Sequence, residues 1–258
     1  MAPLILAWPG ALAIGLSLGL MGSGGSILTV PVLVYLVGQD EKLAIASSLA
    51  IVAVIAAAGS LAYVHKRLVE WRHVMLFGMP GVLGTYLGAW ASQFVAGSAQ
   101  LVLFAVVMLV ASFMMLKPLE VLDAAAPPRS GWKIGLDGAF VGTITGFVGV
   151  GGGFLVVPAL VLLGGLAMRR AVGTSLVIIS INSSTGFLKH LDLLQQQGIA
   201  LDLQVIFVIS LLGVLGSIAG TRISGRLPQA RLKQYFGIFL IATGAFILWR
   251  SMPALIAA

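Results

Sequence analysis

The sequence predicts an all-α integral membrane protein built from two inverted repeats, each a re-entrant or broken helical hairpin followed by three transmembrane helices. Of the 258 residues, 59% are hydrophobic and only 9% are charged, whereas a soluble domain carries about 25% charged residues. The mean hydropathy of +1.09 agrees with this class. An internal repeat supports the division into two halves. So few charges cannot cover a water-facing surface, which argues against a soluble enzyme.

Ten apolar stretches follow one another along the chain, five in each half. They cover 4–20, 26–37, 43–64, 72–95 and 98–116, and then 132–148, 153–167, 170–190, 203–222 and 232–250. A polar, proline-bearing linker at 118–131 joins the first repeat, 1–117, to the second, 132–258. The first stretch has no basic residue before it, so we expect a retained membrane segment and not a secretory signal.

The repeat is carried by glycines at a constant spacing. A shift of 127 residues places one glycine and proline series on another without a gap: Gly15, Gly19, Gly22, Gly24, Gly25 and Pro31 match Gly142, Gly146, Gly149, Gly151, Gly152 and Pro158. After a five-residue insertion the shift becomes 132, and Gly81–Gly84 matches Gly213–Gly216. Two homologous halves follow from this order of matches.

The second apolar stretch of each half is too short to cross a bilayer. Twelve helical residues reach about 18 Å, against a hydrocarbon core of about 30 Å. A glycine cluster, Gly22–Ser26 or Gly149–Gly153, precedes it each time and interrupts the helix. The first two stretches of each half therefore form either one broken span or a hairpin that enters and leaves on the same side.

Loop charge favours the hairpin. With a hairpin in each half, only Lys42, Lys189 and Arg250 of the 15 Lys and Arg residues lie on one side. A single broken span would divide the basic residues almost evenly, against the positive-inside rule. The basic side is then cytoplasmic and both termini are outside. Because three spans follow each hairpin, the second half starts on the opposite side from the first.

Inverted repeats with interrupted helices are typical of secondary transporters, with the substrate near mid-membrane. The helix starts after the two glycine clusters carry free N–H groups and the positive ends of their dipoles. Facing one another, they would form an anion site, to which Ser23 and Ser26 add hydroxyl donors. The alternative is that the glycines only permit close helix packing.

A few other polar residues lie within the predicted spans. Ser47 and Ser48 match Thr174 and Ser175, and Asn182 and Ser183 are polar in the second half only. An amide in lipid needs partners, so Asn182 is a candidate for lining the path. The serines alternatively bond their own backbone.

Three titratable residues are candidates for gating or a proton-linked role. Lys189 either reaches to water or, with His190 exchanging protons, forms a cationic entrance for an anion. Asp137 is the carboxylate nearest the second cluster, although it can also simply offset Lys133. No Asp or Glu lies centrally in a full span, which weakens a carboxylate proton relay or a carboxylate-bound sodium.

Catalysis and metal binding are not expected. The chain has no cysteine and only three histidines, and no nucleophile–base pair is apparent. We therefore expect no catalytic residue, no metal and no cofactor. The net charge of +7 is interpreted as loop charge that sets membrane orientation, not as a nucleic-acid surface.

The glycine clusters also carry a family resemblance. Gly19–Pro31 and Gly146–Pro158 resemble the twin signature of the TauE/SafE sulfite exporter family, as do Gly173–Leu176 and Gly213–Gly220. The likeness covers about residues 10–250 and implies a multi-pass transporter of the bacterial inner membrane (plasma membrane) for sulfite, sulfonates or related organosulfur oxyanions. It implies these substrate-facing residues: Gly22, Ser23, Gly24, Gly25, Ser26, Ser47, Ser48, Gly149, Val150, Gly151, Gly152, Gly153, Thr174 and Ser175.

The site should be asymmetric, because Val150 and Gly153 stand where the first half has Ser23 and Ser26. The leading hypothesis is a carrier of small sulfur-containing anions that works by alternating access, with the lipid bilayer and a coupling proton or other ion as partners. An anion channel with two re-entrant loops and a carrier of a non-sulfur anion are the alternatives. An intramembrane enzyme and a purely structural scaffold fit less well. The anion, the direction, the coupling ion and the oligomeric state stay open.

Overall fold

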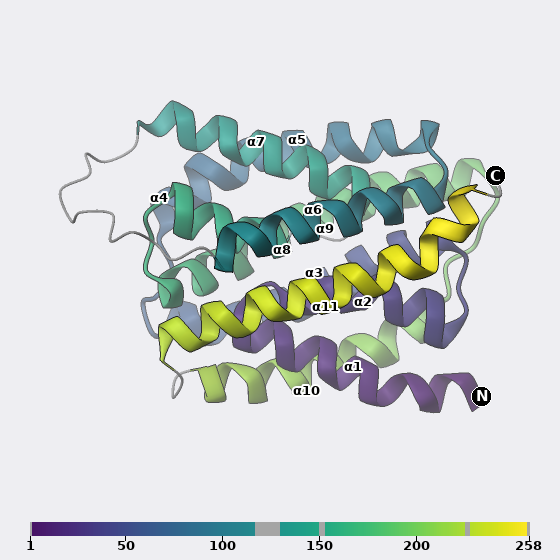
Figure 1. Cartoon of the computed structure of the whole chain (residues 1–258), viewed down its shortest axis with the longest axis horizontal. Helices are drawn as coiled ribbons and strands as arrows, with labels where there is room; N and C mark the ends of the chain where they lie inside the picture. The colour runs from purple at the N-terminus through teal and green to yellow at the C-terminus, as the bar shows by residue number, and fades with distance from the viewer. Residues whose placement is uncertain (1, 117–129, 150–152, 225–227, 257–258) are drawn as a thin grey trace.

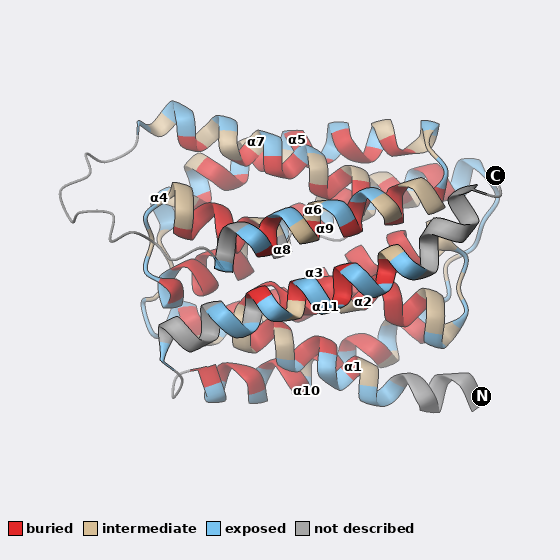
Figure 2. Ribbon diagram, viewed as in Figure 1, coloured by how far each residue is buried: buried red, intermediate tan, exposed pale blue. Residues whose placement is uncertain are grey.

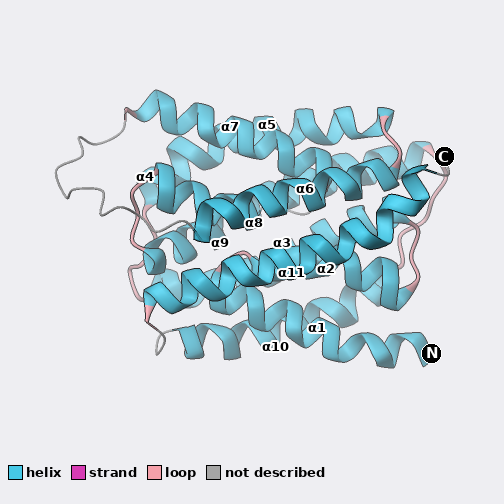
Figure 3. Cartoon of the chain, in the orientation of Figure 1, coloured by secondary structure: helices cyan, strands magenta, loops and turns pink. Residues whose placement is uncertain are grey.

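The computed structural model describes residues 2–116, 130–149, 153–224 and 228–256. Within these ranges the protein consists of helices and connecting loops, without a strand (Figure 3). The long helices lie side by side with their axes close to one common direction (Figure 1). Both ends of the chain lie at one end of the bundle, which we call the termini end. The helix ends next to the linker lie at the other, which we call the basic end.

The first half contains four helical units. The first unit is a hairpin of two limbs, α1 (Ala2–Met21) and α2 (Gly24–Pro31), the second limb continuing as the π-helix η1 (Val32–Val37). The second unit is α3 (Glu41–His65), and the fourth is α6 (Gly97–Leu116). The third unit, between them, is one span made of α4 (Trp71–His73), η2 (Val74–Gly78), α5 (Met79–Ala91) and η3 (Ser92–Phe94).

The second half follows the same order. Its elements are α7 (Gly131–Val148), α8 (Gly153–Pro158), η4 (Ala159–Leu163), α9 (Met168–Gln196), α10 (Leu203–Ser224) and α11 (Gln229–Ile256). These helices cover the ten expected apolar stretches. The second short stretch ends earlier than expected, at Leu163, while α9 and α11 continue about one and a half turns beyond their expected ends.

Several helices can cross a membrane. Among the described residues, α3, the span Trp71–Phe94, α9 and α10 are long and apolar enough by length and composition. Large apolar side chains such as Leu83, Phe140 and Phe207 are about two-thirds exposed on the outer helices. Buried residues face inward (Figure 2). An apolar outer surface of this kind is suited to lipid and not to water.

The first two helices form a hairpin. A Cβ atom on Gly10 would lie 3.2 Å from Val32, and one on Gly25 would meet the carbonyl of Ile14. Positions early in α1 therefore contact positions late in α2–η1, so the two limbs run antiparallel. The turn is at Gly22, whose φ of +73° lies in the left-handed region that favours glycine. For the first half, the hairpin interpretation is correct and the single broken span is not.

The first helix packs closely on α10 of the other half. A Cβ atom on Gly15 would lie 1.9 Å from the carbonyl oxygen of Gly213, and one on Gly19 would lie 2.2 Å from that of Ser217. Both contacts shift in the same direction along the two helices, so α1 and α10 run parallel. The absence of side chains at these glycines lets the two backbones touch.

The same contact recurs between α5 and α7. A Cβ atom on Gly142 would lie 2.2 Å from the carbonyl oxygen of Gly81, and one on Gly146 would lie 2.1 Å from that of Thr85. These residues are related to those of the α1–α10 contact by the sequence shifts of 127 and 132. Equivalent glycines therefore make equivalent contacts in the two places.

Helices α3 and α9 occupy the centre and run antiparallel. The Ser180 hydroxyl donates a hydrogen bond of 3.2 Å to the carbonyl of Ala53, its equivalent in the first half. On one side of this crossing Gly59 faces Leu176, and on the other Gly186 faces Leu49. Ala53 and Ser180 thus mark the middle of the bundle.

Candidate functional site

The first glycine break is held by the second half. The single hydroxyl proton of Ser175 on α9 is shared between the carbonyl oxygen of Val172, at 2.8 Å in the same helix, and that of Gly22, at 3.1 Å. A Cβ atom on Gly22 would lie 2.9 Å from the same hydroxyl. Ser26 donates to the carbonyl of Ser23, whose own hydroxyl is buried without a hydrogen-bond partner among the described residues. The turn is therefore tightly packed and still contains one unpaired polar group.

The second break is held by the first half in the same way. The Ser48 hydroxyl on α3 likewise shares its proton between the carbonyl oxygen of Ile45 in the same helix and that of Gly149, each at 2.8 Å. Gly149 has a left-handed φ of +72°. Ser48 and Gly149 are the equivalents of Ser175 and Gly22. Gly153 begins α8, while Val150, Gly151 and Gly152 lie outside the described residues. Each half thus stabilises the glycine turn of the other.

The two breaks do not face one another, so this expectation was wrong. Ser48 lies five residues before Ala53 on α3, and Ser175 lies five residues before Ser180 on α9. Because α3 and α9 are antiparallel, the two serines lie on opposite sides of the crossing, and the breaks are about 15 Å apart along the bundle at 1.5 Å per residue. The break at Gly22 lies toward the basic end, and the break at Gly149 lies toward the termini end.

The other predicted polar residues of α3 and α9 differ in their partners. Thr174 accepts a hydrogen bond of 2.9 Å from the backbone N–H of Glu70. The hydroxyl of Ser47, its equivalent, is fully buried and has no partner in the part of the chain that the structure describes. Ser183 is also buried. Thr174 therefore has a hydrogen-bond partner at the basic end, whereas its equivalent Ser47, toward the termini end, has none among the described residues.

Asn182 is the most conspicuous polar residue near the middle. Its side chain is 1% exposed, and neither its amide nitrogen nor its oxygen has a hydrogen-bond partner within the described ranges. The amide lies against Gly81 of α5, where a Cβ atom would come within 2.9 Å of its nitrogen. A buried unpaired amide costs about 1–3 kcal/mol per group, so a water or a passing solute would stabilise it.

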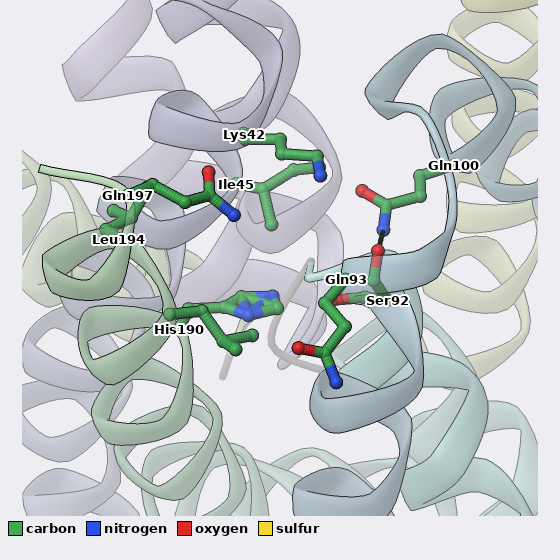
Figure 4. Close-up of a pocket in the computed structure, with 9 residues that line it drawn as sticks. Lys42, Ile45, Ser92, Gln93, Gln100, His190, Leu194 and Gln197 are labelled. Carbon is green, nitrogen blue, oxygen red and sulfur yellow. Dashed lines mark hydrogen bonds between the residues drawn. The ribbon is translucent and has the colours of Figure 1, made fainter. Parts of the chain in front are cut away.

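A small pocket with polar and apolar walls lies beside the second break, at the termini end (Figure 4). It is lined by Lys42 and Ile45 of α3, Ser92 and Gln93 of η3, Gln100 of α6, His190, Leu193 and Leu194 of α9, and Gln197 just after α9. Its cavity volume is about 30 Å³, which is room for about one water molecule. No carboxylate is among these lining residues.

Local structure fixes several of the pocket residues. Lys42 lies in the first turn of α3, where its backbone N–H donates to the side chain of the N-cap residue Asp40 at 3.0 Å. The amide of Gln100 donates to the carbonyl of Ser92 at 2.9 Å, which joins α6 to η3. His190 is only 5% exposed, and its Nε2 has no partner among the described residues. A Cβ atom on Gly149 would lie 3.3 Å from that nitrogen.

The structure separates the three titratable candidates. His190 lines the pocket. Lys189 instead donates to Asp192 at 2.8 Å, and its ammonium lies 5.5 Å from the centre of the Tyr86 ring. Asp137 precedes Gly149 by 12 residues on α7, or about three helical turns, and so lies away from the second break.

Sequence reasoning did not identify Lys42, Gln93, Gln100 or Gln197. One usable signal was that Lys42 is among the few basic residues assigned to the sparsely charged side. The glutamines carry no signal of their own, because each lies near a helix end where polar residues are ordinary. Only the packing of α3, η3, α6 and α9 brings them together.

Within the described residues, a helical bundle with an apolar outer surface, two buried backbone breaks and polar groups without partners is typical of membrane transport proteins. Residues 7–247 match the model of the family described as sulfite exporter TauE/SafE, and the chain belongs to this family. A "probable membrane transporter protein" of Xylella fastidiosa is 32% identical over 251 residues, which covers 95% of this chain and 94% of that protein. The protein is therefore a membrane transporter.

A second relative supports the same class. The "probable membrane transporter protein YunE" of Bacillus subtilis is 31% identical over 197 residues, which covers 67% of this chain and 72% of that protein. No solved structure matches the chain.

Proposed function

We propose that the protein is a secondary transporter that moves small sulfur-containing anions, such as sulfite and sulfonates, across the bacterial inner membrane by alternating access. The family name supports sulfite as the kind of substrate. One structural observation carries the transport mechanism. Two left-handed glycine turns are buried inside the bundle, and each accepts a hydrogen bond from a serine of the other half. Backbone breaks survive in a membrane where they are buried in protein or line a cavity.

The two halves, 1–117 and 132–258, are proposed to be inverted repeats. Parallel packing of α1 on α10 and of α5 on α7, through equivalent glycines, supports a twofold relation between the halves. The relation would place its axis near the contact of Ser180 with Ala53, which are equivalent residues. In such a protein the two halves can exchange conformations, which opens the path to one side and then to the other.

The two ends of the bundle differ in a way that suits alternating access. Tyr63 is the equivalent of His190, and its hydroxyl lies 3.2 Å from the Gly19 carbonyl and 3.4 Å from the Ser224 hydroxyl. At the same end Arg170 forms an ion pair with Glu70. At the basic end these contacts join α3, α1, α10 and α9. The termini end has the pocket described above.

The substrate path is proposed to pass the two breaks and the polar residues of α3 and α9. Ser23, Ser47 and Asn182 all keep buried hydrogen-bonding groups unpaired among the described residues. Their hydroxyl and amide groups can donate hydrogen bonds to an anion. The remaining members of the predicted set, which include Ser183, Gly151 and Gly152, stay proposals.

Uptake into proteoliposomes tests this function. Radiolabelled sulfite, taurine and sulfoacetate are offered to vesicles with the purified protein and to protein-free vesicles of the same lipid. Saturable uptake of at least one compound, above the protein-free control, is expected. If none of the three enters faster than the control, the substrate class is wrong. A flux that rises linearly with concentration would indicate a channel.

A further inference from the structure

We propose that the pocket at the termini end is a binding site for the transported oxyanion, and that the Lys42 ammonium and the His190 Nε2 bind it there. This inference rests on the proposed transport of anions and adds the residues that recognise them. The glycine motifs do not predict Lys42 and His190 as binding residues, because the pocket residues come from four separate segments of the chain.

The charge of the pocket wall favours an anion. Lys42 supplies a positive charge, and no Asp or Glu lines the pocket. The nearby acidic residues have other contacts. Asp40 caps the start of α3, Asp192 is paired with Lys189, and the Glu41 carboxylate lies against Gly97. A charge-assisted hydrogen bond from an ammonium to an oxyanion is about twice as strong as a neutral one.

His190 provides the second contact. A buried ring nitrogen without a hydrogen-bond partner is unfavourable, and an anion in the pocket would provide the missing partner. The imidazole can donate from Nε2 when it is neutral with the proton on that nitrogen, and it donates from both nitrogens when protonated. Its position beside Gly149 places the anion next to the second glycine turn.

The remaining walls combine amide groups with an apolar side, and the pocket must widen to admit an anion the size of sulfite. Figure 4 places the amide groups of Gln93 and Gln197 around the same space as Lys42 and His190. Gln100 is held by its hydrogen bond to Ser92 and fixes one wall. Ile45 and Leu194 form an apolar side. A few polar groups set in apolar walls are typical of sites for small ligands.

The equivalent location at the basic end has a different side chain with hydrogen-bond partners of its own. There Tyr63 replaces His190 and lies within hydrogen-bonding distance of Gly19 and Ser224. The oxyanion would therefore bind first at the termini end, where His190 is unpaired.

The experiment compares Lys42→Gln and His190→Gln with wild type and with Lys133→Gln, a matched control. Lys133 is near the start of α7 at the basic end, with its ammonium 5.7 Å from the centre of the Trp132 ring. Sulfite uptake into proteoliposomes gives KM and the maximal rate, and calorimetry at constant ionic strength gives the dissociation constant. Thermal unfolding confirms that each variant is folded.

We expect Lys42→Gln to raise both KM and the dissociation constant for sulfite about tenfold, which corresponds to the loss of one hydrogen bond to a charged group. His190→Gln should raise them by several fold, and Lys133→Gln should leave them unchanged. If both pocket variants are folded and keep wild-type values, the pocket is not the binding site, although the transport function stands. Wild-type protein that neither binds nor transports sulfite or a sulfonate would instead refute the proposed function. If His190→Gln does not fold, Lys42→Gln alone decides.

Discussion

The close contact of α5 with α7 leads to a sharp prediction for Gly142→Ala. In the structure, a Cβ atom on Gly142 would lie 2.2 Å from the carbonyl oxygen of Gly81. Carbon and oxygen atoms that are not bonded stay beyond about 3 Å, so the two helices must separate by about 1 Å. Overpacking of this kind costs about 1–3 kcal/mol.

Gly135→Ala on the same helix is the matched control. Its Cβ atom would have its nearest neighbour at 3.5 Å, which is an ordinary van der Waals contact. Alanine also has a higher helix propensity than glycine, by about 1 kcal/mol. The control should therefore leave stability unchanged or raise it slightly, while Gly142→Ala should lower it despite the same gain in propensity.

Thermal unfolding of the purified protein in one detergent measures the difference. At about 2–4 °C per kcal/mol for a chain of this size, Gly142→Ala should unfold several degrees below wild type, and Gly135→Ala at or above it. Equal midpoints for the two variants would refute the close backbone contact between α5 and α7. The same outcome would weaken the proposed twofold relation, because the α1–α10 contact depends on equivalent glycines.

A further prediction concerns the basic end of the bundle. Tyr63→Phe removes the hydroxyl beside Gly19 and should loosen the basic end. Because the chain has no cysteine, Val172→Cys, beside Gly22, gives a single reporter thiol. In the Tyr63→Phe background this thiol should react about fivefold faster with a water-soluble thiol reagent. An unchanged rate would show that the Tyr63 hydroxyl does not keep the basic end closed to water.

Much of the fold was predictable because its signals are local. Apolar length identified the helices, and the glycine clusters identified the interruptions. The loop charges favoured the hairpin that α1 and α2–η1 form. The repeat also paired Ser48 with Ser175, and the structure gives both the same role at the opposite glycine turn.

The relative depth of the breaks was not predictable in the same way. A cluster in the sequence shows where a helix is interrupted but not how far its hairpin reaches. The first limb, α1, has 20 residues and spans about 30 Å, so its turn lies beyond the middle of the bundle. The second break, at Gly149 after α7, lies on the other side of the middle, which places the two breaks at different depths.

The pocket was missed for a different physical reason. Lys42, Gln93, Gln100 and His190 are far apart in the sequence and meet only through the packing of four elements. Periodicity and motifs describe single segments, so they do not report such contacts. His190 was noticed because a histidine inside an apolar segment is unusual, and its neighbours had no comparable signal.

Counterflow tests the central claim of a carrier for small sulfur anions most directly. Proteoliposomes are loaded with unlabelled sulfite and diluted into a trace of radiolabelled sulfite. We expect a transient accumulation of label inside the vesicles above its equilibrium level. A carrier site that faces one side at a time carries unlabelled sulfite out and returns with labelled sulfite. Label that only rises to equilibrium, at the same rate in loaded and empty vesicles, would contradict a carrier mechanism.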